Sequence, residues 1–83
     1  MVDSKREPIP PYRRMADALR EDIRAKRLLP GEQVSSATEL AETHNVSTNT
    51  AARALRLLRD EGYLVTQQGW GSFVADPLPR SDG

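Results

Sequence analysis

The sequence of 83 residues has no cysteine and few aromatic side chains, with one Trp, two Tyr and one Phe. Without cysteine the chain cannot form disulfides or thiolate metal sites. No apolar run approaches the roughly 18 residues that a membrane span needs. The first residues also lack the apolar stretch of a signal peptide. We therefore expect a cytoplasmic protein that makes no membrane contact.

The chain also has no surplus of either charge, because 12 basic and 12 acidic residues cancel. Nucleic-acid-binding modules usually carry an excess of Lys and Arg, so a DNA-binding role requires the charges to be segregated. They are segregated in part. Residues 1–27 hold eight basic and five acidic side chains, and residues 48–59 hold three arginines and no acid. Net neutrality therefore does not exclude DNA as a partner.

The small size of the chain limits it to one domain, because a chain this short buries only about 60% of its unfolded surface. A deep enzyme cleft is not expected at this size. Residues 1–11 combine charges with prolines and predict a flexible N-terminal arm, and residues 76–83 predict a flexible tail. The folded domain is expected to span residues 12–75.

Helical periodicity predicts a first helix over about residues 11–25, stopped by the Pro-Gly turn in residues 28–31. Its apolar stripe consists of Tyr12, Met15, Ala16, Leu19 and Ile23. A second, short helix is predicted to begin after Ser36, because Glu39 stands three residues later and completes a capping box.

A third helix is expected after a sharp bend at Asn45, with Ser47 as its N-cap. A rotation of about 100° per residue puts aliphatic residues on one flank and polar residues on the other. The buried flank holds Ala51, Ala54, Leu55 and Leu58. The outward flank, which is the candidate reading face, holds Asn49, Ala52, Arg53 and Arg56.

Gly62 is expected to end this helix, and two β-prone segments follow it. Residues 63–66 and 72–74 predict a hairpin whose turn spans residues 67–71, and residues 33–34 are candidates for a further short strand. The order predicts an α+β fold, mostly α, namely a winged helix-turn-helix of three helices and a small antiparallel β-hairpin wing. This fold presents its third helix to the major groove of DNA.

The same order of elements resembles the GntR family of bacterial transcription regulators over residues 12–75. The matching residues are Tyr12, residues 16–20, 29–32, Ser36, 39–41, 46–47, Thr50, 54–55, Leu58, 61–62, 68–69 and 71–74. The resemblance implies a sequence-specific DNA-binding regulator, a repressor, whose partner is double-stranded DNA carrying a near-palindromic operator. It also implies a homodimer, formed in solution or only on the DNA.

The resemblance further implies a larger effector-binding domain after the wing, and this chain ends near the point where that domain would begin. We therefore expect a stand-alone small regulator, which Met1 favours, or a shortened form of a longer protein. Either form is expected to lack a small-molecule effector site.

Three segments of the chain depart from the family pattern. Family members typically read Pro-Ser-Glu-Arg where residues 35–38 read Ser-Ser-Ala-Thr. They typically carry arginines at the positions of Thr48 and Ala52, and often a basic residue at the position of Trp70. Because those arginines normally contact bases and phosphates, a second function stays open. It is a winged-helix protein–protein interaction module with weakened DNA readout.

The predicted DNA contacts fall in the third helix, at two helix starts and in the wing. Asn49 suits an adenine edge and Arg53 a guanine edge, and Arg56 suits the DNA backbone; the alternative for each is a solvated helix face. Hydroxyl groups near the two helix starts suit phosphate oxygens, namely those of Ser36, Thr38, Thr48 and Thr50. For Ser36, a capping role explains the residue equally well. The predicted wing contacts are Gln68, Gly69 and Trp70.

Several other residues keep more than one interpretation. Trp70 suits insertion into the minor groove, packing back onto the domain, or docking to a second protein. Arg13 and Arg14 suit phosphate contact or simple solvation. Arg59 is expected to face solvent or to pair with the two acids that follow it.

The sequence contains none of the residue sets that enzymes and metal sites require. His44 is the only histidine and has no partner at ligand spacing, so it is expected to fill a turn. No nucleophile–base pair, metal-ligand cluster or glycine-rich phosphate loop is present. We therefore expect a protein that is not an enzyme and that binds no cofactor or metal.

Overall fold

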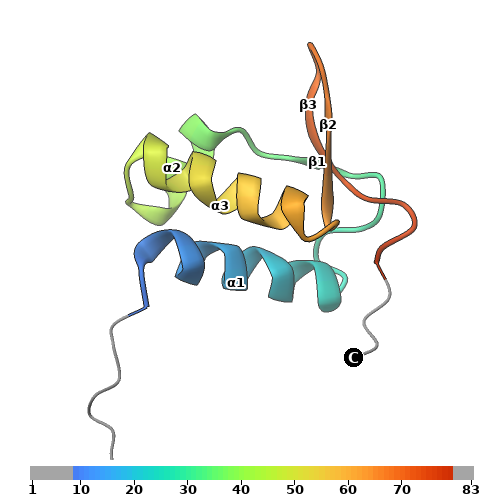
Figure 1. Cartoon of the computed structure of the whole chain (residues 1–83), viewed down its shortest axis with the longest axis horizontal. Coiled ribbons are helices and arrows are strands. Elements are labelled where there is room, and N and C mark those ends of the chain that lie inside the picture. Colours follow the sequence, from blue (N-terminus) through green and yellow to red (C-terminus); the bar gives the residue numbers. More distant parts are fainter. Residues whose placement is uncertain (1–8, 80–83) are drawn as a thin grey trace, which may run out of the picture.

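A computed structural model describes residues 9–79. Residues 1–8 of the expected arm and residues 80–83 of the expected tail lie outside the described part. Within it, helices and strands follow in the order α1, β1, α2, α3, β2 and β3 (Figure 1). Their bounds are Pro11–Arg24 for α1, Gln33–Val34 for β1, Ala37–His44 for α2, Thr48–Asp60 for α3, Leu64–Gln67 for β2 and Gly71–Val74 for β3. The predicted winged helix-turn-helix is confirmed.

α1 is an amphipathic helix that begins at a pair of prolines. Pro10 is its N-cap and Pro11 its first residue, a position where the missing N–H has no intrahelical partner to lose. The predicted apolar stripe faces the core, with Tyr12 half-buried and the remaining members buried: Met15, Ala16, Leu19 and Ile23.

The end of α1 has a different cause from the predicted one. The predicted end near residue 25 is confirmed, since the last helical residue is Arg24, but Lys26 already adopts a left-handed φ of 67°, before the Pro-Gly turn in residues 28–31. The N–H of Arg27 then donates to the carbonyl of Asp22 at 2.8 Å, which closes the helix end. The predicted cause of the stop is therefore wrong, and the Pro-Gly pair only makes the later turn into β1.

α2 and α3 form the helix-turn-helix, and side-chain hydrogen bonds define both helix starts. Ser36 Oγ accepts from the N–H of Glu39 at 3.1 Å, and Glu39 Oε1 accepts from the N–H of Ser36 at 3.1 Å, so the predicted capping box is confirmed. Asn45 takes a left-handed φ of 56° at the end of α2. Val46 packs against the core, and Ser47 then caps α3. The bend between the helices is thus confirmed as well.

The sheet contains the candidate third strand in addition to the predicted hairpin. β3 lies in the middle and pairs antiparallel with both β1 and β2. Gln33 is opposite Phe73, and Leu64 is opposite Val74. Because side chains alternate between the faces of a strand, Leu64, Val74 and Val34 are buried on the inner face. The wing is therefore tied to the domain by β1 as well as by the end of α3.

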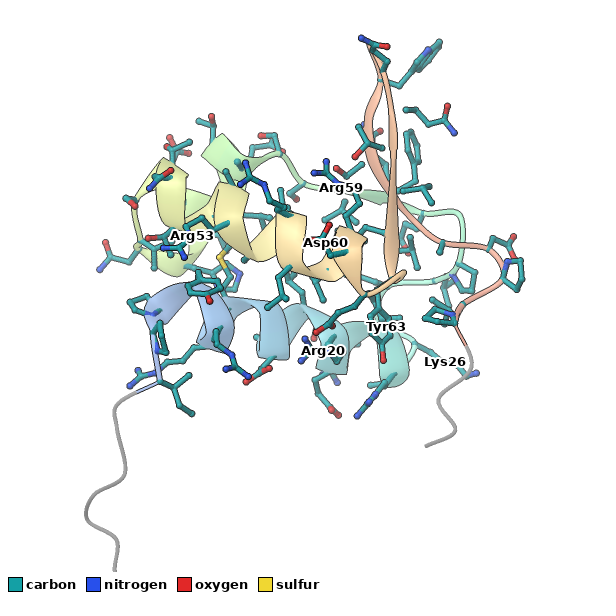
Figure 2. The ribbon with its side chains drawn as sticks, in the orientation of Figure 1. Arg20, Lys26, Arg53, Arg59, Asp60 and Tyr63 are labelled. Atoms are coloured by element: carbon teal, nitrogen blue, oxygen red, sulfur yellow. The ribbon has the colours of Figure 1, made fainter. Side chains whose placement is uncertain are left out.

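Arg20 ties α1 to the end of α3. Its Nη2 lies 2.7 Å from Glu61 Oε1, its Nη1 lies 2.6 Å from Asp17 Oδ1, and its guanidinium lies 5.8 Å from the centroid of the Tyr63 ring (Figure 2). Burial alone would lower the pKa of Arg20, but the hydrogen bonds to Glu61 and Asp17 outweigh that effect and raise the pKa. Arg20 therefore remains charged as a link between the two helices.

The chain after β3 returns to the domain before it leaves the described part. Leu78 packs against the core, and Pro79 would lie 3.6 Å from a Cβ placed on Gly62. Gly62 itself has a φ of 90°, as the predicted C′ glycine of α3 requires. The first residues of the expected tail, 76–79, are thus in contact with the body of the domain.

Candidate nucleic-acid interface

α3 has one buried and one exposed flank. Ala51, Ala54 and Leu58 are completely buried, and Leu55 is half-buried. Ala52, which the sequence places on the outward flank, is also half-buried. The exposed side chains of that flank are Asn49, Arg53 and Arg56. The helix therefore has the predicted orientation, with the aliphatic flank in the core and these polar side chains facing outward.

The start of α3 is organised by hydroxyl groups. Ser47 Oγ accepts from the N–H of Thr50 at 3.0 Å and donates to Thr50 Oγ1 at 2.9 Å. Thr50 is half-buried and engaged in this cap, whereas Thr48 and Asn49 are exposed in the first turn. N–H groups in the first turn of a helix have no carbonyl partner within it. Thr48 and Asn49 are thus better placed than Thr50 to meet a phosphate.

The arginines of α3 lie on different sides of the helix (Figure 2). Arg53 is on the side of α1, where its Cζ lies 4.2 Å from the centroid of the Tyr12 ring. Arg59 is on the side of the wing. Arg56 is exposed and falls between them at about 100° of rotation per residue. Within residues 9–79, none of these three arginines forms an ion pair. Their charges are therefore not neutralised by a carboxylate of the described chain.

Of the two alternatives for Arg59, exposure to solvent is confirmed, and pairing with the two acids that follow it is wrong. Arg59 Nη1 donates instead to Thr66 Oγ1 of β2 at 3.2 Å. Glu61 faces the other side of α3 and is occupied by Arg20. Arg59 is exposed, and its hydrogen bond joins α3 to the base of the wing.

An open groove of about 610 Å³ separates the start of α2 from the wing, with Leu55 of α3 also in its lining. Two predicted contacts, Ser36 and Trp70, line it together, although they are far apart in the sequence. The Ser36 oxygen accepts a capping hydrogen bond, but a hydroxyl also donates, so capping leaves it able to donate to a phosphate. Thr38, in the first turn of α2, is exposed.

The tip of the wing is a tight turn that holds Trp70 outward. Gly69 has a φ of 86°, and the N–H of Trp70 donates to the carbonyl of Gln67 at 2.8 Å. The Trp70 side chain is 75% exposed, so the interpretation that it packs onto the domain is wrong. Gln68 and Gly69 are exposed beside it. The indole of Trp70 at the wing tip is therefore accessible to a binding partner.

Gln33 is a residue of this site that the sequence did not indicate. Its Nε2 donates to the carbonyl of Trp70 at 2.8 Å, across 37 residues of sequence. Gly71 has a φ of 123°, which favours glycine, and a Cβ there would lie 2.9 Å from the same Nε2, so a larger residue would displace the Gln33 amide. The Gln33 side chain thus fixes the backbone at the wing tip, and no local sequence pattern could have predicted the contact.

The remaining candidates lie at the periphery. Arg13 and Arg14 are exposed in the first turn of α1, and His44 is exposed at the end of α2. Across residues 9–79, no group of three His, Asp or Glu side chains is arranged to hold a metal ion. None of the helices described is both long and apolar enough to span a membrane.

A helix-turn-helix with an exposed polar flank on its last helix, followed by a hairpin, defines the chain as a winged helix-turn-helix domain. The profile described as "Bacterial regulatory proteins, gntR family" matches residues 11–74. The chain belongs to this family, and the resemblance of residues 12–75 is confirmed.

Known proteins support both the family and the fold. A histidine utilization repressor from Klebsiella aerogenes is 40% identical over 74 residues, which cover 89% of this chain and 31% of that protein. The chain thus spans about a third of the length of this relative. A transcriptional regulator from Oenococcus oeni has the same fold, with a TM-score of 0.82 at 24% identity over 90% of this chain and 61% of that one.

A structure described as AraR(DBD) in complex with operator ORR3 is also similar. It has a TM-score of 0.80 and 28% identity, and the match covers 90% of this chain and 89% of that chain. The match therefore includes nearly all of a domain that was solved with its operator.

Proposed function

We propose that residues 12–75 are the sequence-specific DNA-binding domain of a bacterial transcription regulator that acts as a repressor. α3 lies in the major groove, and the wing lies on the adjacent backbone or in the minor groove. The family membership, the repressor from Klebsiella aerogenes and the operator complex of AraR(DBD) support this proposal. The observation that carries it is the exposed flank of α3, where arginines that have no carboxylate partner among residues 9–79 are held outward by a buried aliphatic flank.

The side chains of α3 take different roles in this proposal. Asn49 reads an adenine edge and Arg53 a guanine edge, because their paired donors and acceptors match those bases in the major groove. Arg56, farther along the helix, contacts the backbone. Phosphate contacts position a protein on the duplex, and base contacts give it specificity.

The other predicted residues hold the backbone on either side of α3. Thr38 and Thr48 in the first turns of α2 and α3 donate to phosphates, together with the neighbouring N–H groups. Ser36 and Thr50 add weaker contacts, because both already serve as caps. Gln68, Gly69 and Trp70 at the wing tip reach the neighbouring backbone or the minor groove.

We also infer a symmetric arrangement on DNA. Two copies related by a twofold axis would bind the half-sites of a near-palindromic operator, because the symmetry of a dimer is matched by the symmetry of its site. The chain acts in the cytoplasm, where bacterial DNA is located, and it works by binding, without enzymatic activity.

Fluorescence anisotropy with labelled DNA tests the proposal. The duplex is selected from a random library with the purified protein, and a scrambled duplex of the same composition is the comparison. We expect tighter binding to the selected duplex and a linear fall of log K with log salt, with a slope of about −0.9 for each phosphate contacted. Equal affinity for both duplexes, or affinity that does not depend on salt, would contradict it.

A pair of arginine variants adds a control within the same chain. Arg56→Ala is expected to weaken binding to both duplexes and to reduce the salt slope by about 0.9, because one phosphate contact is lost. Arg24→Ala removes an exposed arginine at the end of α1, away from the interface, and is expected to leave the slope unchanged.

A second function remains a candidate because of the wing. Trp70 is 75% exposed and Val65 is 42% exposed, and exposed apolar side chains are typical of protein-docking surfaces. A protein-interaction module would lose partner binding in Trp70→Ala and keep it in Arg56→Ala. A DNA reader would lose DNA binding in Arg56→Ala, so the two variants distinguish the functions.

A further inference from the structure

Arg53 and Tyr12 form the contact between α3 and α1 that lies nearest to the reading face. The guanidinium carbon of Arg53 is 4.2 Å from the centroid of the Tyr12 ring, well inside the distance of about 6 Å at which a cation–π interaction forms. Tyr12 packs against the core, in a helix whose start is fixed by Pro10 and Pro11. The ring is therefore a firm support for an otherwise flexible side chain.

Among residues 9–79, no acceptor takes a side-chain hydrogen bond from Arg53, and no carboxylate pairs with it. A guanidinium carries five N–H donors in its plane, and the contact with Tyr12 is made at the guanidinium carbon, so donors remain for another partner. The other arginines with contacts in the described chain differ. Arg20 uses its donors on Asp17 and Glu61. Arg27 uses one on Asp22, and Arg59 uses one on Thr66.

We propose that Tyr12 is the positioning residue for Arg53, holding its guanidinium over the ring so that its N–H groups donate to a pair of acceptor atoms on the DNA. The proposal rests on the DNA-binding function proposed above. The acceptor pair is the O6 and N7 of a guanine or two oxygens of a phosphate, because both match the same planar edge. The stack lowers the entropy that Arg53 loses on binding, since the side chain is already ordered.

A double-mutant cycle tests the proposal by anisotropy on the selected and scrambled duplexes. Arg53→Ala is expected to weaken binding to the selected duplex by about five- to a hundredfold. Tyr12→Leu is expected to weaken it by about two- to fivefold, the size of an exposed cation–π contact. Tyr12→Phe keeps the ring and should bind like the unchanged protein. In the Arg53→Ala background, Tyr12→Leu should have no further effect.

The other tyrosine of the chain provides the matched control. Tyr63 also lies beneath an arginine, but that arginine donates to carboxylates. Tyr63→Leu is therefore expected to leave the ratio of affinities for the two duplexes unchanged. In the free protein, the Arg53 δ-methylene protons should show an upfield ring-current shift in NMR spectra. Tyr12→Phe should keep that shift and Tyr12→Leu should lose it, which reports the stack without DNA.

The same variants identify the acceptor. If it is a guanine, Arg53→Ala relaxes selection at one base position, and replacing that guanine with 7-deazaguanine weakens the unchanged protein but not the variant. If it is a phosphate, Arg53→Ala weakens both duplexes alike and reduces the salt slope by about 0.9. Either result supports the proposal when the Tyr12 effect disappears in the Arg53→Ala background.

Three results would overturn the proposal. The first is a Tyr12→Leu effect of the same size with and without Arg53, which would make the role of Tyr12 purely structural. The second is a loss in Tyr12→Phe equal to that in Tyr12→Leu, which would assign the effect to the hydroxyl. The third is unchanged binding in Arg53→Ala, in which case DNA binding by the chain still stands. If the unchanged protein binds no duplex at all, the proposed function itself fails and this proposal fails with it.

Discussion

Lys26 has a backbone conformation that is unfavourable for a residue with a side chain. Its φ of 67° is a conformation that costs an ordinary L-residue about 1–2 kcal/mol, whereas glycine adopts it freely. We expect Lys26→Gly to raise the free energy of unfolding by about 1 kcal/mol, after allowance for the greater freedom of glycine in the unfolded chain. Thermal unfolding followed by circular dichroism should show a Tm higher by about 4–8 °C for a domain of this size.

Lys26→Ala is the control for that substitution. It removes the ammonium group but keeps the Cβ that causes the strain, so its stability should stay close to that of the unchanged protein. An equal gain in both variants would mean that the charge of Lys26, and not its conformation, limits stability.

Single residues could be predicted from the sequence where their role is local. Ser36, Asn45 and Ser47 are cap or bend residues whose partners stand within a few positions, and the structure confirms all three. Lys26 has no such pattern, because a left-handed lysine is uncommon and only the folded chain shows it. Gln33 and Tyr12 act on residues more than thirty positions away, so no short window contains the contact.

At the level of the elements, α1 and α3 are joined by two contacts with the same spacing. Arg53 lies over Tyr12, and Arg20 pairs with Glu61; both pairs are 41 residues apart (53 − 12 and 61 − 20). The helices therefore run side by side in the same direction (Figure 1). One contact supports the reading face, and the other holds the end of α3.

The second contact can be removed without touching the reading face. Arg20 is only 18% exposed, but Glu61 and Asp17 are 37% and 55% exposed, so solvent screens the ion pairs considerably. We expect Arg20→Met to lower the free energy of unfolding by about 1 kcal/mol, measured by urea denaturation. The preference for the selected over the scrambled duplex should not change.

Arg24→Met is the matched control, because Arg24 lies one helical turn farther along and is exposed. Its effect on stability should stay within about 0.5 kcal/mol. If Arg20→Met lost DNA selectivity while its stability stayed unchanged, the contact between Arg20 and Glu61 would be needed to position the reading face.

The charge pattern of α3 changes sign at its end. Asp60 is exposed and, on a helical wheel of about 100° per residue, falls on the same outward side as Asn49 and Arg56. A carboxylate there repels phosphates. We expect Asp60→Asn to tighten binding to the selected and the scrambled duplex alike, by about two- to fivefold at low salt, and by less as salt screens the charge.

Glu21→Gln removes the same charge from the opposite side of α1, where the helical wheel places Glu21 away from the apolar stripe. It should therefore change DNA affinity much less. Titrations of both variants at two salt concentrations check the comparison, and an equal gain from both would attribute the effect to net charge alone.

The elements themselves were predictable to different degrees. The buried side of α3 could be predicted because its apolar residues recur with helical periodicity over several turns. β1 has two residues, too few for a periodic pattern, and it forms because β3 supplies a partner strand. The direction taken by each arginine of α3 depends on Tyr12 and Thr66, which belong to other elements, and so it could not be read from the helix alone.

For the whole molecule, zero net charge is compatible with a basic interface because the ion pairs lie elsewhere. Among residues 9–79, the ion pairs join Arg20 to Asp17 and Glu61, and Arg27 to Asp22. Four charged side chains of α1 and the turn after it are therefore engaged in ion pairs, whereas the arginines of α3 form none with residues 9–79. Folding thus adds to the charge segregation that the sequence shows only in part, although Asp60 remains an exposed acid on the outward side of α3.

The fluorescence of a single side chain can show whether the wing contacts DNA when the whole molecule is bound. Trp70 is the only tryptophan of the chain and lies at the exposed wing tip, so its fluorescence comes from the wing alone. If the wing lies against DNA, the selected duplex should shift the emission and protect the indole from acrylamide. Both changes should saturate at the same DNA concentration as the anisotropy.

Gln33→Ala makes this measurement specific to the geometry of the tip. The variant loses the hydrogen bond to the Trp70 carbonyl but keeps the indole, so the free protein should retain its emission while DNA affinity falls by about two- to tenfold, the cost of one hydrogen bond. Because α3 is untouched, the base preference should be preserved. An indole that stays equally accessible to acrylamide on saturating DNA would place the wing away from the duplex and favour Trp70 as a contact for a second protein.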